Sequence, residues 1–80
     1  MKVDVKLYAT LRSYGPAGLE VGESFPLALD EGSVEEALMK LSIPPEKAKI
    51  IMVNGIRVED NSQLMEDGDL LVVFPPIGGG

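Results

Sequence analysis

Hydrophobic and polar residues alternate at two places in the N-terminal third of the chain, and this period predicts two β-strands. In residues 2–8 every second residue is apolar, so one face of the strand would lie on a core. Residues 24–30 repeat the alternation, with Phe25, Leu27 and Leu29 on one face. Because Pro26 has no backbone N–H to donate, we expect this second strand at a sheet edge. Residues 10–18, which contain glycine and proline, are expected to form a loop.

The period changes to that of an α-helix in residues 33–43. Four apolar residues fall on one face of this helix: Val34, Ala37, Leu38 and Leu41. Ser33 and Glu36 have the spacing of a capping box, in which each side chain binds a free backbone N–H of the first turn. Pro44 and Pro45 are expected to end the helix.

Three further strands are predicted in the C-terminal half. Asn54 and Gly55 are the preferred pair for a two-residue type I′ turn, so residues 50–53 and 56–58 should form a hairpin. Residues 70–74, LLVVF, are apolar at every position, which predicts a strand buried on both faces. This order of elements predicts an α+β fold of the β-grasp type. A mixed sheet of about five strands would pack on one main helix, with the first and last strands in the middle of the sheet.

The composition narrows the possible functions. Thirteen acidic and seven basic residues give a net charge of −6, which is unsuited to nucleic acid or to an anionic membrane surface. The chain contains no cysteine and no histidine, so thiolate metal sites, thiol nucleophiles and the commonest general base are excluded. The N-terminus is too polar for a signal peptide, and no apolar run approaches the about 20 residues of a membrane span. We therefore expect a cytoplasmic protein that holds no cofactor stably.

Two groups of side chains invite a functional interpretation but are better explained structurally. Glu66, Asp67 and Asp69 lack the spacing of a calcium loop, and the Asp-Gly pair favours turn chemistry over a metal site. Met39, Met52 and Met65 are expected to fill the core rather than to form a contact surface.

The last seven residues, FPPIGGG, combine conformationally restricted prolines, apolar side chains and glycines, which have no side chain. Two prolines would limit the swing of this segment, while Phe74 and Ile77 could anchor it in apolar pockets of a partner. Three glycines without side chains could then pass through a narrow channel. We expect a folded domain over residues 1–75 and a flexible glycine tail over residues 76–80. A disordered, inert end fits the composition equally well.

If this tail is functional, its reactive group is the terminal carboxylate of Gly80. A carboxylate is a poor electrophile, so a partner would have to activate it, most simply as an acyl-adenylate formed from ATP. A sulfur donor could then displace AMP and leave a thiocarboxylate. Alternatively, a lysine amine could attack and form an isopeptide bond.

Three segments of the sequence are similar to segments of ubiquitin-like sulfur carriers: LYATLR at 7–12, VNG at 53–55 and LMEDGDLLVVFPPIGGG at 64–80. Their order matches along the whole chain. The most specific part is DGD, an apolar strand, FPP, one apolar residue and then glycines. On these residues the chain resembles the MoaD/ThiS family, in particular the small subunit of molybdopterin synthase.

The resemblance implies a ubiquitin-like β-grasp protein that is not itself an enzyme. A ubiquitin-activating-type enzyme would adenylate Gly80 with ATP, and a thiocarboxylate would form there. In molybdenum and tungsten cofactor synthesis, the tail enters the large synthase subunit and gives up its sulfur to a pterin precursor. The residues that would contact these partners are Phe74, Pro75, Pro76, Ile77, Gly78 and Gly79.

Other branches of the family that the chain resembles have related functions. Carriers of this kind also serve other sulfur pathways such as thiamine synthesis, although FPP favours the molybdopterin branch. Some relatives are protein modifiers that are conjugated to lysines. The common ending has two glycines after a small or polar residue, so Gly78 is a departure from it.

Overall fold

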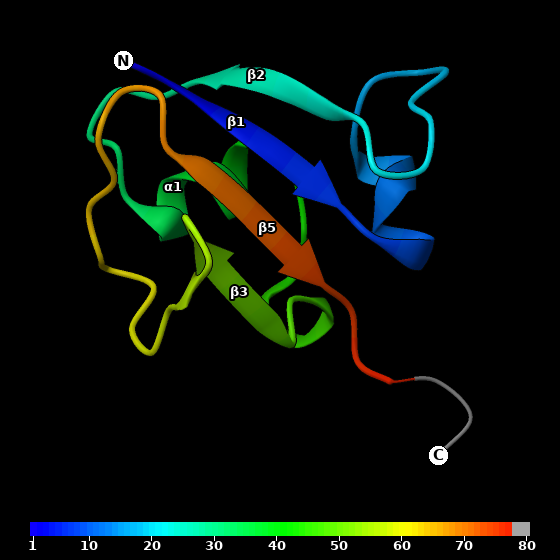
Figure 1. The fold of residues 1–80 in the computed structure, drawn as a ribbon. Coiled ribbons are helices and arrows are strands. Elements are labelled where there is room, and N and C mark those ends of the chain that lie inside the picture. The colour runs from blue at the N-terminus through cyan, green and yellow to red at the C-terminus, as the bar shows by residue number, and fades with distance from the viewer. Residues whose placement is uncertain (78–80) are drawn as a thin grey trace.

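The structure, a computed structural model, describes residues 1–77 as one mixed sheet crossed by a single α-helix (Figure 1). The strands are β1 (Lys2–Leu7), β2 (Ser24–Ala28), β3 (Ile50–Val53), β4 (Ile56–Arg57) and β5 (Leu70–Phe74), and the helix is α1 (Val34–Lys40). Two short 3₁₀ helices cover Ala9–Tyr14 and Pro45–Lys47. The strand order is β2-β1-β5-β3-β4. The predicted two-layer α+β fold is confirmed, with β2 at an edge and β1 and β5 inside the sheet.

The parallel pair β1 and β5 forms the middle of the sheet, and each member has an antiparallel partner on its other side. β2 pairs with β1, and there Pro26 lies opposite Asp4. β3 pairs with β5 and continues into β4 through the predicted turn. Asn54 and Gly55 both have positive φ, 51° and 82°, as a type I′ turn requires.

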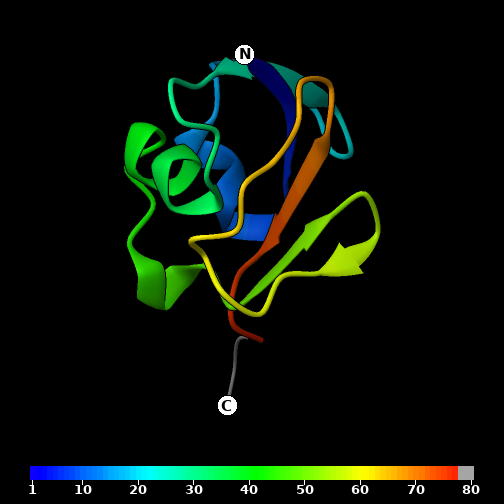
Figure 2. The ribbon, with the colours of Figure 1, turned by 90° about the vertical axis from the view of Figure 1, so that its left-hand side faces the viewer.

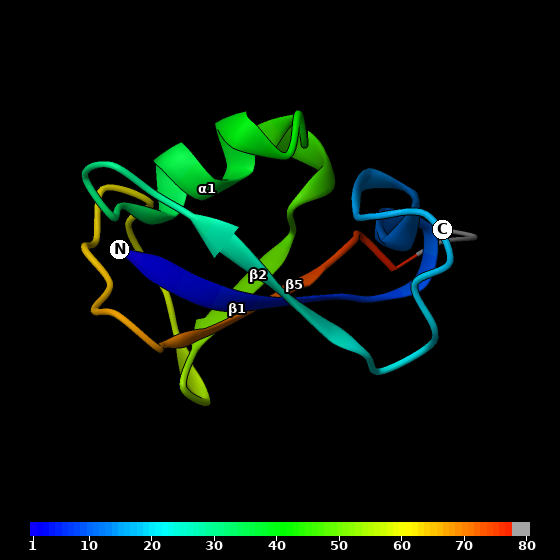
Figure 3. The same ribbon diagram turned by 90° about the horizontal axis from the view of Figure 1, so that it is seen from above.

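The hydrophobic core lies between α1 and the inner face of the sheet (Figures 2 and 3). Its strand and helix members are at most 9% exposed: Val3, Val5, Leu7, Phe25, Val34, Ala37, Leu38, Ile51, Val53, Leu71 and Val73. Leu11, which is 1% exposed, enters the core from the 3₁₀ helix after β1. This insertion orders part of the segment that the sequence predicted to be only a loop. Burial of each such Leu or Val side chain contributes about 1.5–3 kcal/mol.

The outer face of the sheet corrects the prediction that β5 is buried on both faces. Leu71 and Val73 are fully buried, but the residues that alternate with them are only half-buried. In Figure 3, α1 lies on one side of the sheet, and no element formed by residues 1–77 covers the other side. A continuous apolar run therefore marks a strand that has one face on the core and one apolar face left open.

The methionines correct a second prediction. Met65 is 5% exposed and fills the core as expected. Met52 lies half-buried on the outer face of β3, and Met39 is 71% exposed on α1. Two of the three methionines thus present apolar surface on opposite layers of the molecule.

A polar junction joins the β3–β4 turn to the start of β5. The Asp69 carboxylate accepts hydrogen bonds from the backbone N–H of Glu66 (2.8 Å) and from the side-chain amide of Asn54 (2.9 Å). The N–H of Leu70 donates to the Asn54 side-chain oxygen at 2.9 Å. The two bonds to the carboxylate, first that from Glu66 and then that from Asn54, hold the pKa of Asp69 below its usual value. The hydrogen bonds of this junction connect the VNG and DGD segments, and they support turn chemistry for the acidic cluster.

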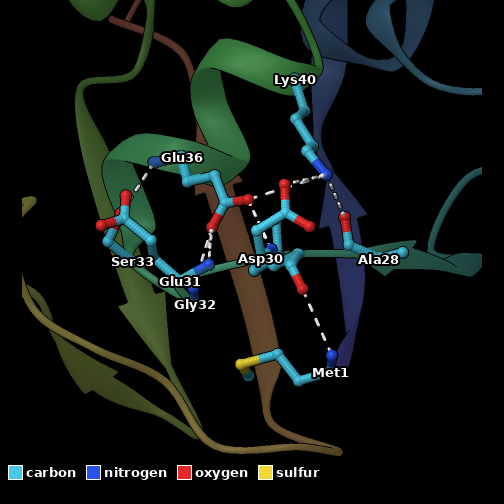
Figure 4. Close-up of polar contacts among 9 residues, drawn as sticks. Met1, Ala28, Asp30, Glu31, Gly32, Ser33, Glu36 and Lys40 are labelled. Carbon is cyan, nitrogen blue, oxygen red and sulfur yellow. Dashed lines mark hydrogen bonds and ion pairs between the residues drawn. The ribbon is translucent and has the colours of Figure 1, made fainter.

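The start of α1 follows the predicted capping box only in part. The Ser33 hydroxyl accepts the N–H of Glu36 at 3.0 Å, as predicted. The Glu36 carboxylate, however, accepts the N–H groups of Asp30, Glu31 and Gly32 at 2.6, 2.9 and 2.8 Å (Figure 4). The loop from β2 thus curls around this carboxylate, which satisfies three backbone donors that precede the helix.

The Glu36 contacts predict a pH-dependent stability. Hydrogen bonds from Asp30 and then Gly32, with a smaller effect of the Lys40 ammonium 3.6 Å away, lower the pKa of Glu36 from its ordinary 4.5. The Glu36 carboxylate therefore binds a proton more readily in the unfolded chain than in the folded one. The stabilisation of the fold by this carboxylate is complete above pH 4.5 and is lost as pH falls through the lowered pKa. We expect the unfolding temperature, followed by circular dichroism between about pH 5 and 3, to fall less steeply in Glu36→Gln than in the wild type.

Glu35→Gln is the matched control, because Glu35 lies in the same helical turn and is exposed. This variant should keep the wild-type pH dependence. Equal slopes for the wild type and Glu36→Gln would show that the Glu36 hydrogen bonds do not contribute as described.

Candidate functional site

The predicted functional segment leaves the sheet at the end of β5 (Figure 1). The carbonyl of Phe74 accepts the N–H of Lys49 at 2.9 Å. Pro75 and Pro76 have no N–H, so they cannot extend the strand ladder. Exposure rises along the segment, from half-buried Phe74 and Pro75 to Ile77, which is 93% exposed. Ile77 therefore presents an apolar side chain that its own domain does not cover.

An aromatic pair marks the point of departure. The ring of Phe74 stacks on the ring of Tyr8, with 4.8 Å between centroids and 11° between planes. Tyr8 directly follows β1, and its N–H donates to the carbonyl of Val73 at 3.2 Å. On the other side of Phe74, Ile50 of β3 lies opposite it. Tyr8, Phe74 and Ile50 thus form an apolar row where the C-terminal segment begins.

Sequence reasoning missed Tyr8, because the alternation placed it with the polar residues of β1. Its aromatic ring in the LYATLR segment was the available signal. The parallel pairing of β1 with β5, which brings Tyr8 beside Phe74, could not be read from that segment alone.

Half-buried apolar side chains continue from this row across the outer face of the sheet. We call this surface the open face; its members are Tyr8, Ile50, Met52, Leu70, Val72 and Phe74. Residues that lie directly opposite on neighbouring strands project to the same side of a sheet. Val72 accordingly lies between Lys6 and Met52, and Arg57 follows beside Met52. An apolar patch flanked by charged side chains is typical of a protein-binding surface.

The described residues position the predicted site but do not include all of it. The structure places Phe74, Pro75, Pro76 and Ile77 in sequence from the sheet outward. The predicted reactive residue Gly80 and its neighbours Gly78 and Gly79 lie outside the described residues. Within residues 1–77, no three potential metal-binding side chains are grouped together. No helix in the same part of the chain is both long and apolar enough to cross a membrane.

Several solved structures share the fold. A putative molybdopterin converting factor, subunit 1, from Pyrococcus furiosus has 28% identity and a TM-score of 0.68, over 95% of this chain and 98% of that one. The small archaeal modifier protein 1 from Methanosarcina acetivorans has 27% identity and a TM-score of 0.67, over 99% and 96%. A complex of subunits 1 and 2 of molybdopterin-converting factor from Helicobacter pylori 26695 contains a chain with 19% identity and a TM-score of 0.63, covered fully in both directions.

These neighbours confirm the predicted ubiquitin-like β-grasp fold. No curated protein sequence matches the chain. The model of the ThiS family, however, matches residues 5–80, which include the LYATLR, VNG and FPPIGGG segments. The chain therefore belongs to the ThiS family of small ubiquitin-like carrier proteins.

Proposed function

We propose that this protein is a sulfur carrier whose Gly80 carboxylate is adenylated by a partner enzyme and converted to a thiocarboxylate. The observation that supports this most directly is the end of β5, where two prolines and a 93% exposed Ile77 lead the chain away from the core beside the open face. This geometry separates a docking surface from a segment that can enter a partner. Membership of the ThiS family supports the same assignment.

The chemistry needs no catalytic side chain from the carrier. A carboxylate oxygen of Gly80 attacks the α-phosphorus of ATP, pyrophosphate leaves, and an acyl-adenylate forms. A hydrosulfide equivalent then attacks the acyl carbon, and AMP leaves with the electrons of the broken C–O bond. The carrier contributes the acyl group and a surface that a partner recognises, while the partner supplies the catalytic groups.

We further propose that the carrier delivers sulfur in molybdenum or tungsten cofactor synthesis and that it docks on a larger subunit. The Pyrococcus furiosus and Helicobacter pylori neighbours, both described as subunits of molybdopterin converting factor, support this pathway. The Helicobacter pylori protein is seen in complex with subunit 2. Docking through the open face would place the C-terminal segment at the partner surface, because Phe74 belongs to both regions and Tyr8 of the open face stacks on it.

A mass measurement tests the proposal. The protein is incubated with the adenylating enzyme of the same organism, ATP and sulfide, and its intact mass is recorded. We expect an increase that corresponds to one oxygen replaced by sulfur, and no increase when ATP is omitted. The proposal would be contradicted if the enzyme modifies another carrier under the same conditions but leaves this protein unmodified.

A second candidate function is conjugation to proteins, which the similarity to small archaeal modifier protein 1 favours. The same adenylate would then be attacked by a lysine amine, with loss of AMP. Digests of cell protein would contain lysines that carry a remnant ending in Gly80. Sulfur incorporation without such remnants would favour the carrier function.

A further inference from the structure

Phe74 is the last residue of β5 and the point from which the C-terminal segment leaves the sheet; we call it the hinge of this segment. Its carbonyl is held by the N–H of Lys49 at 2.9 Å, which is the last bond between β5 and the region before β3. Proline fixes φ near −65°, and a residue before proline is restricted to extended conformations. Pro75 and Pro76 therefore continue from Phe74 as a stiff, extended segment. A change in the backbone orientation of Phe74 would therefore change the direction of the segment that follows it.

The second contact that holds this hinge is the ring of Tyr8. Its stacking on Phe74 covers the outer side of the last residue of β5. Tyr8 is itself fixed from both sides. Its N–H donates to the Val73 carbonyl at 3.2 Å, and its carbonyl accepts the N–H of Leu11 at 3.1 Å. Because Leu11 is 1% exposed, Tyr8 is tied to the core rather than to a surface loop.

We propose that Tyr8 is a positioning residue for the C-terminal segment: its ring holds Phe74 in the sheet and so sets the direction in which residues 75–77 leave. This inference rests on the proposed function for its biological meaning. Pre-organisation of the segment would reduce the conformational entropy that the segment loses when it binds a partner. The role requires an aromatic ring at position 8 but does not require the tyrosine hydroxyl.

Amide exchange and relaxation in the isolated protein test the positioning itself. In ¹⁵N-labelled Tyr8→Ala, we expect hydrogen exchange of the Lys49 amide to be about 2- to 10-fold faster than in the wild type, since local opening at Phe74 frees this donor. The heteronuclear NOE of the Phe74 and Ile77 amides should fall. Tyr8→Phe should restore both quantities. Met52→Ala, which shortens another member of the open face, should leave both unchanged. Tyr8→Leu replaces Tyr8→Ala if the latter does not fold.

Rates of adenylation supply the functional arm. We expect kcat/KM for the carrier to fall about 3- to 10-fold in Tyr8→Ala and to return to within about twofold of the wild type in Tyr8→Phe. Wild-type exchange and NOE values in a folded Tyr8→Ala protein would overturn the positioning role. Altered exchange with an unchanged rate would overturn its importance for function. If the wild type is not adenylated at all, the proposed function fails, while the exchange data still decide whether Tyr8 holds the hinge.

Discussion

Deleting Gly79 and Gly80 is expected to abolish thiocarboxylate formation and to leave the unfolding temperature unchanged. The new terminal carboxylate would lie about 7 Å short of the position that Gly80 reaches, at about 3.3 Å per extended residue. An active site built for the full length could not bring it to ATP. The core ends at Val73, and Ile77 is already 93% exposed, so the deletion removes no buried contact from the described structure. Intact mass after incubation with the adenylating enzyme, and thermal melting by circular dichroism, measure the two effects.

Gly78→Ser is the control for this deletion, because it changes a glycine without shortening the chain. It introduces a residue that is small and polar before the glycine pair, where the common ending has a small or polar residue, and we expect it to be modified like the wild type. Modification of the truncated protein at the wild-type rate would contradict the assignment of Gly80. A lower melting temperature after truncation would show that the glycines contribute to the fold.

Local signals in the sequence were sufficient to place the strands. Pro26 identified β2 as an edge strand because proline removes one ladder donor, and Asn54-Gly55 identified the hairpin because both residues tolerate positive φ. Each signal depends on a backbone property of one or two residues. Tertiary context therefore had little opportunity to override it.

The site was harder to predict, because its features depend on pairs that are distant in sequence. The sequence does not show whether a second layer of the chain covers the outward-facing apolar side chains of β5. For this reason the prediction that LLVVF is buried on both faces was wrong. The stacking of Tyr8 on Phe74 follows from the parallel register of β1 and β5. Glu36 was assigned to its own helix cap because the curl of the preceding loop is not visible in the capping pattern.

The open face gives the second large prediction: Met52→Glu is expected to weaken binding to the adenylating enzyme about 30-fold to several hundredfold. Met52 lies inside this apolar surface, next to Val72 on the central strand. Removing a charged carboxylate from water in the middle of an apolar interface would cost about 2–4 kcal/mol, and each 1.4 kcal/mol changes Kd about tenfold. Isothermal titration calorimetry with the purified enzyme measures the change in Kd.

The same substitution should be tolerated by the free protein. Arg57 of β4 lies directly opposite Met52, so the new glutamate would face a cation across the strand pair. Opposite charges in such a position contribute about 0.2–1 kcal/mol, which offsets part of the lost apolar contact. We therefore expect the melting temperature to change little, and a wild-type melting curve would separate a docking defect from unfolding.

Met39→Glu is the matched control for docking, because it makes the same chemical change on the opposite layer. Met39 is 71% exposed on α1, so the variant alters the net charge equally without touching the open face. If the partner binds the open face, Met39→Glu keeps wild-type affinity. Equal weakening by both variants would point instead to general charge repulsion by the partner, and weakening by Met39→Glu alone would move the docking surface to the helix layer.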